Sequence, residues 1–90
     1  MGDDTFIKLC KEKIVDYTNT TMNLNSIDRP FYISTNNVQV VWFDRVLQNS
    51  KALLSTTIND GLYYEVIYNE DKNELYFDVY KRIRNKVKLK

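Results

Sequence analysis

Glu65 and Asp78 are the residues of this chain whose types and expected placement come nearest to chemistry. Two neighbouring carboxylates can perform general acid–base catalysis or, with a third acid such as Asp44, bind a divalent cation. Both uses need an enclosing pocket that tunes the acids, and side chains on a flat sheet lack such a pocket. The residues that alternate with the two acids are the tyrosines Tyr63, Tyr76 and Tyr80.

Histidine is absent from the chain, and only one cysteine, Cys10, and two glycines are present. Histidine-dependent catalytic triads and zinc clusters of histidine and cysteine are therefore excluded. Two glycines are too few for a Walker or dinucleotide-binding loop. The sequence thus predicts a protein that is not an enzyme and that uses no cofactor or metal.

Tyrosines around an acidic pair favour a binding surface, because tyrosine offers a large, rigid, amphipathic contact area at low entropic cost. We predict a partner-binding face that suits a protein with a basic surface or a second copy of this chain. Its residues are Tyr63, Glu65, Tyr76, Asp78 and Tyr80. The alternative is a solvated face, on which a lysine or arginine from a neighbouring element lies between the two acids.

Four runs rich in β-branched and aromatic residues must position this face. Turn signals at residues 48–50, 59–61 and 70–73 separate the runs and predict a four-stranded antiparallel meander over residues 38–83. A three-residue loop ending at Gly61, in the left-handed conformation, would pair Leu54 with Val66. A four-residue loop at 70–73 would place Glu65 directly opposite Asp78, where two carboxylates repel unless a cation, a shared proton or a partner separates them.

Alternation along the strands predicts which side chains face the core. The inward set is Ala52, Leu54, Thr56, Ile58, Leu62, Tyr64, Val66, Tyr68, Leu75, Phe77 and Val79. The first strand, residues 38–47, has two possible orientations: either Val40, Trp42 and Val46 point inward, or Val41, Phe43 and Leu47 do.

An amphipathic N-terminal helix is predicted over residues 4–18, with Asp3, Asp4 and Thr5 as candidate N-caps. Its apolar stripe includes Cys10, which we expect to be buried. The apolar face of the sheet must be buried against another element, and the helix is the element available. The predicted fold class is therefore α+β, with one helix packed on the meander in a single domain. Residues 19–37 are predicted to form a crossing loop, in which residues 31–33 make a short strand or tuck under the sheet edge.

The final ten residues carry six cations and no acid, which leaves seven cations and 12 acids in residues 1–80. We predict an acidic body with a basic tail at residues 84–90. Candidate contacts for nucleic acid or an acidic partner are Arg82, Arg84, Lys86 and Lys88. Nucleic acid is the second choice as a partner, because the acids of the tyrosine face would repel phosphate.

No apolar run approaches the ~18 residues of a membrane span, and no secretory signal is visible. With a single cysteine, we expect a reducing, cytoplasmic setting and no membrane partner.

Several runs of the meander carry a resemblance: Val40-Val41-Trp42, Leu47-Gln48-Asn49, and residues 51–57, 60–65, 68–69 and 76–81. They resemble a family of small proteins encoded by phages and prophages of Gram-positive bacteria. The resemblance implies a phage accessory protein in the bacterial host cytoplasm, with no assigned activity or site residue to carry over. We therefore expect a non-catalytic protein that binds a host protein, such as a nucleic-acid-handling or defence protein, and inhibits or redirects it.

Overall fold

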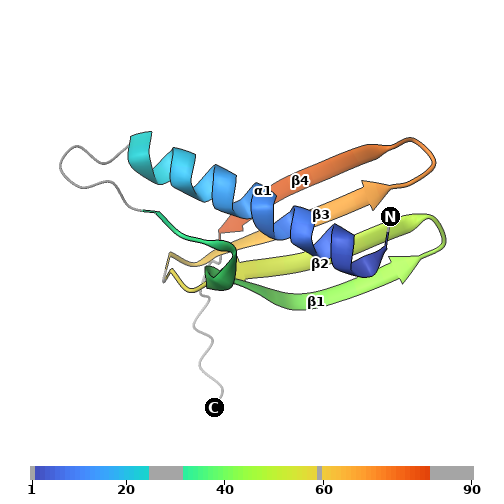
Figure 1. Ribbon diagram of the computed structural model, residues 1–90, viewed down its shortest axis with the longest axis horizontal. Coiled ribbons are helices and arrows are strands. Elements are labelled where there is room, and N and C mark those ends of the chain that lie inside the picture. The colour runs from blue at the N-terminus through green and yellow to red at the C-terminus, as the bar shows by residue number, and fades with distance from the viewer. Residues whose placement is uncertain (1, 25–31, 59, 82–90) are drawn as a thin grey trace, which may run out of the picture.

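The computed structural model describes residues 2–24, 32–58 and 60–81. They form helix α1 (Asp3–Leu24), a short 3-10 helix η1 (Thr35–Asn37) and strands β1 (Val38–Val46), β2 (Asn49–Thr56), β3 (Leu62–Asn69) and β4 (Glu74–Lys81). The strands make one antiparallel sheet in the order β1-β2-β3-β4, and α1 lies slantwise across one of its faces (Figure 1). The predicted α+β architecture is confirmed.

The core lies between α1 and the sheet. Its fully buried side chains are Phe6, Cys10 and Ile14 from α1, Ala52 and Leu54 from β2, and Tyr64 and Val66 from β3. Burying a side chain as large as isoleucine or leucine contributes about 1.5–3 kcal/mol, so this cluster holds the helix on the sheet. The inward set predicted from alternation lies on this helix-covered face, with the side chains of β4 only half-buried there.

The helix is longer than predicted: it begins at Asp3 and continues past residue 18 to Leu24. At its start, the carbonyl of Gly2 accepts a hydrogen bond from the Phe6 amide, so the candidate caps Asp3 and Asp4 lie within the first turn. Carboxylates there are favoured by the helix dipole. In its second half, Thr18 hydrogen-bonds with Tyr64 and Asn19 with Ile33, so polar residues of the helix have partners in other parts of the fold.

Asn19 fastens the chain that follows the helix. Its Oδ1 accepts a hydrogen bond from the Ile33 amide at 2.8 Å, and its Nδ2 donates to the Ile33 carbonyl at 3.1 Å. The side-chain amide thus makes the pair of backbone hydrogen bonds that a neighbouring strand would otherwise make. The Ile33 side chain is buried in the core, and Tyr32 is exposed. Residues 31–33 were expected either to form a short strand or to tuck under the sheet edge. Ile33 is buried and forms no strand, which agrees with the second expectation; Phe31 lies outside the described residues.

The connection between β2 and β3 is longer than the predicted loop 59–61. Thr56 Oγ1 accepts a hydrogen bond from the Ile58 amide, and Asp60 Oδ1 accepts one from the Leu62 amide, so side chains close the turn before the ladder begins. Leu54 consequently pairs with Tyr64 instead of Val66. A shift of two residues keeps every side chain on its predicted face. Gly61 has the expected left-handed conformation, with φ 73°.

Strand β1 follows neither predicted orientation, because a β-bulge changes its register. Val40 pairs with Leu54 and Trp42 with Leu53, which leaves Val41 as the extra residue. Val40 therefore shares the helix-covered face before the bulge, and Phe43 shares it after the bulge. The strand ends at Val46, and the β1–β2 turn consists of Leu47 and Gln48 in place of the predicted 48–50.

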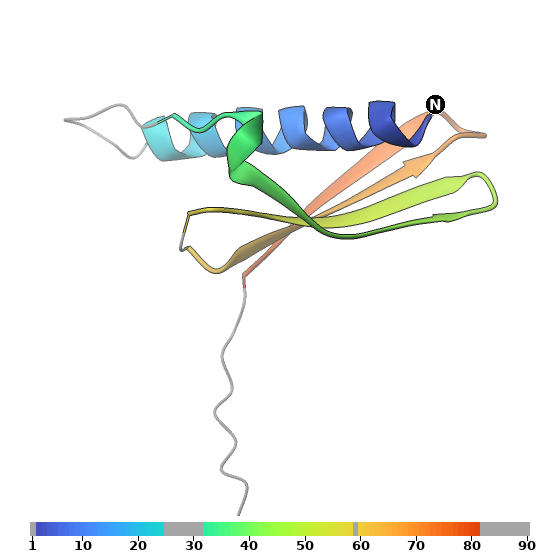
Figure 2. The same ribbon diagram turned by 60° about the horizontal axis from the view of Figure 1, so that its bottom comes forward.

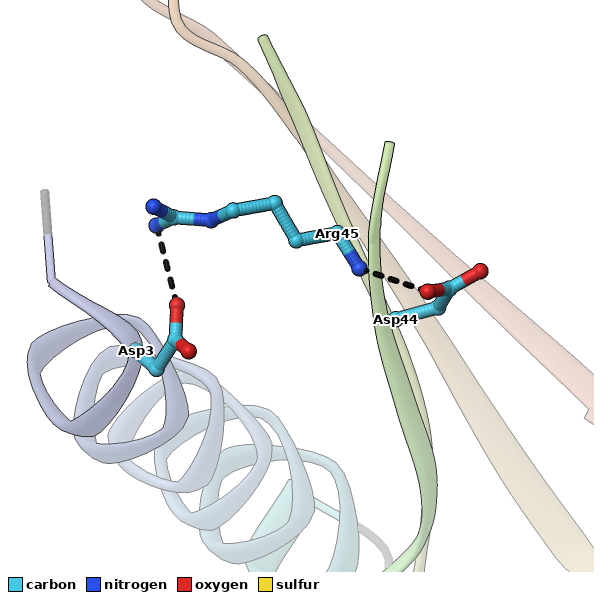
Figure 3. Close-up of polar contacts among 3 residues, drawn as sticks. All are labelled: Asp3, Asp44 and Arg45. Atoms are coloured by element: carbon cyan, nitrogen blue, oxygen red, sulfur yellow. Dashed lines mark hydrogen bonds and ion pairs between the residues drawn. The ribbon is translucent and has the colours of Figure 1, made fainter. Parts of the chain in front are cut away.

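Beyond the bulge, strand alternation places two adjacent charges on opposite faces of the sheet (Figure 3). Arg45 reaches toward the helix, where its Nη2 lies 3.1 Å from Oδ1 of Asp3. Asp44 points the other way, and its Oδ1 accepts a hydrogen bond from the Arg45 amide at 2.9 Å. The start of α1 is thereby joined to the end of β1.

Candidate protein-binding face

The sheet face opposite α1, called the outer face below, carries all five residues of the predicted binding face. Among the residues that the structure describes, no helix covers it (Figure 2). By the strand register, its side chains are Gln39, Trp42, Asp44 and Val46 from β1; Asn49, Lys51, Leu53 and Ser55 from β2; Tyr63, Glu65, Ile67 and Asn69 from β3; and Glu74, Tyr76, Asp78 and Tyr80 from β4.

The register between β3 and β4 is the predicted one. Glu65 lies directly opposite Asp78, and Tyr63 lies opposite Tyr80. Tyr76 and Tyr80 are 48% and 50% exposed, and Asp78 is also exposed, whereas Tyr63 and Glu65 in the inner strand are half-buried. The predicted residues therefore form one continuous patch with an acidic pair at its centre.

A cation lies beside one of the two acids. Nζ of Lys51, in β2, is 3.6 Å from Oε2 of Glu65, and the Tyr80 hydroxyl donates a long hydrogen bond of 3.5 Å to Oε1 of Glu65. This arrangement fits the alternative expectation of a neighbouring cation, but only for Glu65: Asp78 makes no hydrogen bond or ion pair with another described residue. Asp78 is thus an exposed carboxylate at the centre of the face.

Trp42 and Lys51 extend the patch toward β1. Lys51 Nζ lies 5.7 Å from the centre of the Trp42 ring, within the range of a cation–π interaction. The two residues border a hollow that Val46, Ile67, Asp44 and Asn49 complete. The sequence does not predict the face of Trp42, because that face depends on the bulge, whereas the outward position of Lys51 follows from the same alternation that placed Leu53 outward.

Two tyrosines of the face remain neutral donors at neutral pH. The negative charge of Glu65, with that of Asp78, raises the pKa of Tyr80 above its usual value of 10.0. The hydrogen bond that the Tyr76 hydroxyl donates to Glu74 raises the pKa of Tyr76. Each phenol is therefore held uncharged beside a carboxylate.

The match to a known family covers nearly the whole chain. Residues 7–89 match the model of a family of unknown function (DUF6275). The chain belongs to this family. The match includes most of α1 and all four strands, so it extends well beyond the meander runs that carry the resemblance noted above. No match to the chain was found among curated proteins or among solved structures.

The DUF6275 chain does not assemble the metal site considered from its sequence. Asp44 lies on β1 and Asp78 on β4, at opposite edges of the sheet, which places them about 14 Å apart at the usual spacing of strands. Within residues 2–24, 32–58 and 60–81, no group of three or more metal-ligating side chains is found. No described helix is both long enough and apolar enough to span a bilayer.

Cys10 is fully buried in the DUF6275 core, as expected. Burial raises the pKa of its thiol to about 12, so the sulfur stays protonated. The candidate basic contacts Arg82, Arg84, Lys86 and Lys88 lie outside the described residues. The candidate site in the described chain is the outer face, with its tyrosines, its acids and the Trp42–Lys51 pair.

Proposed function

We propose that this protein binds a host protein through the outer face and inhibits or redirects it without catalysis. The observation that carries the proposal is the exposed patch in which Tyr76, Asp78 and Tyr80 surround the Glu65 carboxylate. Exposed aromatic residues of this kind dominate the energy of protein interfaces when they are buried by a partner.

The charges of the face favour a basic protein over nucleic acid. Its described acids are Asp44, Glu65, Glu74 and Asp78, whereas Lys51 is its cation and is already paired with Glu65. Such a surface attracts a positively charged patch and repels phosphate. A host protein that handles nucleic acid, or a defence protein with a basic groove, has the required charge.

The phage part of the proposal is supported by the resemblance of the meander to small phage and prophage proteins of Gram-positive bacteria. An accessory protein of this kind acts in the bacterial host cytoplasm. The fully buried, protonated Cys10 is consistent with a reducing compartment.

Affinity purification from infected cells tests the face directly. The wild-type chain is compared with Tyr76→Ala/Asp78→Lys, which removes one tyrosine and reverses one acid of the outer face. Loss of two central contacts should weaken binding of the captured partner by roughly 30-fold or more.

A matched control changes a tyrosine and an acidic residue elsewhere. Tyr32→Ala/Glu12→Lys alters an exposed tyrosine and an exposed acid that lie away from the outer face, and it should recover the partner as the wild type does. Equal recovery of partners by the wild type and by Tyr76→Ala/Asp78→Lys would contradict the proposal.

A salt titration separates this function from nucleic-acid binding. If the chain bound single-stranded nucleic acid through its basic tail, affinity would fall steeply with salt and with removal of residues 82–90. The proposal expects the captured protein partner to be retained after that removal.

A further inference from the structure

The two edge strands of the sheet, β1 and β4, differ in how regular they are. β1 is interrupted by the bulge at Val41, which bends an edge and discourages pairing. β4 runs from Glu74 to Lys81 without a bulge, a proline or a glycine. Among the described residues β4 pairs with β3 alone, so its other side presents a regular row of backbone donors and acceptors.

The apolar residues of β4 are incompletely covered on the helix side. Leu75, Phe77 and Val79 are only half-buried, and Tyr17 of α1, whose ring centre is 5.6 Å from that of Phe77, is 38% exposed. A groove of about 490 Å³ opens between α1 and β4 at this edge. The core therefore ends at β4 with apolar surface still in contact with water, which a further strand would cover.

We infer that β4 pairs antiparallel with β4 of a second copy, so that the two sheets join into one of eight strands. A two-fold axis normal to the sheet keeps the same face outward in both copies and pairs residues symmetrically about one position. With the axis at Phe77, Leu75 lies opposite Val79 of the second copy on the helix side. On the outer face, Tyr76 lies opposite Asp78 and Glu74 opposite Tyr80.

This register is self-complementary, which favours a second copy over a foreign peptide. Each outer pair joins a phenol to a carboxylate, and each inner pair is apolar. The neighbouring symmetric registers are worse: an axis at Asp78 would oppose two Asp78 carboxylates, and an axis at Tyr76 would oppose Glu74 to Asp78. Like charges directly opposite one another in a sheet are destabilising.

The helix side supports the same arrangement. The two-fold axis places both helices on one side of the joined sheet and brings the two grooves face to face. The half-buried Phe77 side chains then meet across the axis between the two Tyr17 rings. The outer faces of the copies become one continuous surface, so the dimer goes beyond the proposed function and does not depend on it.

Sedimentation equilibrium of the purified full chain tests the dimer without any partner. The wild type should show a concentration-dependent dimer. Tyr80→Glu places a carboxylate opposite Glu74 of the second copy at two symmetric positions, which should raise the dimer dissociation constant roughly tenfold. Glu74→Lys/Tyr80→Glu should restore it, because each new cation then faces a new acid.

The rescue can only act between copies, because residues 74 and 80 of one strand lie about 20 Å apart. Tyr63→Glu is the matched control: Tyr63 lies on the outer face opposite Tyr80, but on the inner strand β3, and its variant should dimerise as the wild type does. Circular dichroism verifies that each variant is folded.

A wild-type monomer at every concentration, a dimer insensitive to Tyr80→Glu, or a dimer equally weakened by Tyr63→Glu would overturn the inference. Failure of the double variant to restore dimerisation would do the same. If Tyr80→Glu does not fold, the chain Tyr76→Cys/Asp78→Cys replaces it. Mild oxidation should then give a covalent dimer through the directly opposed new thiols, and a monomer under these conditions would count against the pairing.

Discussion

The hydroxyl of Thr18 lies 3.3 Å from the phenol oxygen of Tyr64, in a buried hydrogen bond that joins α1 to β3. Both side chains sit among apolar neighbours, where a polar group without a partner is costly. Thr18→Val should therefore lower the free energy of unfolding by about 1–3 kcal/mol, because the Tyr64 phenol is left unpaired. Urea denaturation measures the loss.

The double variant Thr18→Val/Tyr64→Phe removes both polar groups, so its loss should be smaller than the sum of the two single losses. Thr20→Val, at an exposed position of the same helix, is the control and should change stability by less than about 0.5 kcal/mol. Strict additivity of the two buried substitutions would show that the hydrogen bond contributes nothing.

Both hydrogen bonds between the Asn19 side chain and the Ile33 backbone should contribute to the stability of the fold. Asn19→Asp keeps the oxygen that accepts from the Ile33 amide but loses the nitrogen that donates to the Ile33 carbonyl. We expect Asn19→Ala to cost about 1–2 kcal/mol and Asn19→Asp to cost less than that. Hydrogen exchange at the Ile33 amide gives the check: exchange should accelerate strongly in Asn19→Ala, and unchanged protection would refute the assignment.

Stability should fall at alkaline pH because of Cys10. The folded thiol has a pKa of about 12, raised by burial from 9.0, so above pH 9 the unfolded chain loses this proton while the folded chain keeps it. Proton loss from the unfolded state alone stabilises that state, and the free energy of unfolding declines as pH rises from 9 toward 12. Tyr64, whose pKa is also raised by burial, adds a decline of the same sign.

Cys10→Ala isolates the thiol contribution. This variant is less stable at pH 7, because it leaves a small cavity, but its stability should decline less steeply above pH 9 than that of the wild type. A thiol reagent should modify the wild-type chain only slowly until denaturant is added. Equal slopes for the two proteins, or rapid modification of the folded wild type, would argue against the buried thiol.

Leu47 carries backbone strain in the β1–β2 turn. It is 86% exposed and has φ 55°, a left-handed conformation that costs a residue with a Cβ about 1–2 kcal/mol. Since its side chain contributes little packing, Leu47→Gly should raise the free energy of unfolding by about 0.5–1 kcal/mol after the entropic cost of glycine. The matched control Gln48→Gly, at the turn residue without a left-handed φ, should be destabilising; a loss of stability in Leu47→Gly would contradict the prediction.

Alternation was sufficient to predict the two faces of the sheet, because a side-chain period of two survives an even register error. The predicted pairing of Leu54 was wrong by two residues, yet Tyr64 and Val66 still lie in the core. The bulge at Val41 was beyond prediction, since consecutive valines fit either face and only packing against α1 selects Phe43. The placement of Trp42 beside Lys51 was not predicted either, because it depends on this bulge. The part of α1 beyond residue 18 was also missed, because Asn19 is stabilised there by hydrogen bonds to Ile33, which is distant in sequence.

Asp78 should lower the stability of the fold and, under the proposed function, strengthen binding of the basic partner. It lies opposite Glu65 and has no ion pair with a described residue, so Asp78→Asn removes a repulsion and should raise the free energy of unfolding by about 0.2–1 kcal/mol. The gain should shrink in high salt, which screens exposed charges. Asp71→Asn, in the β3–β4 turn, provides the comparison and should change stability little. Under the proposed function, the same Asp78→Asn variant binds the basic partner more weakly, so stability and affinity move in opposite directions. A variant that loses stability at low salt would show that Glu65 and Asp78 do not repel one another across the ladder.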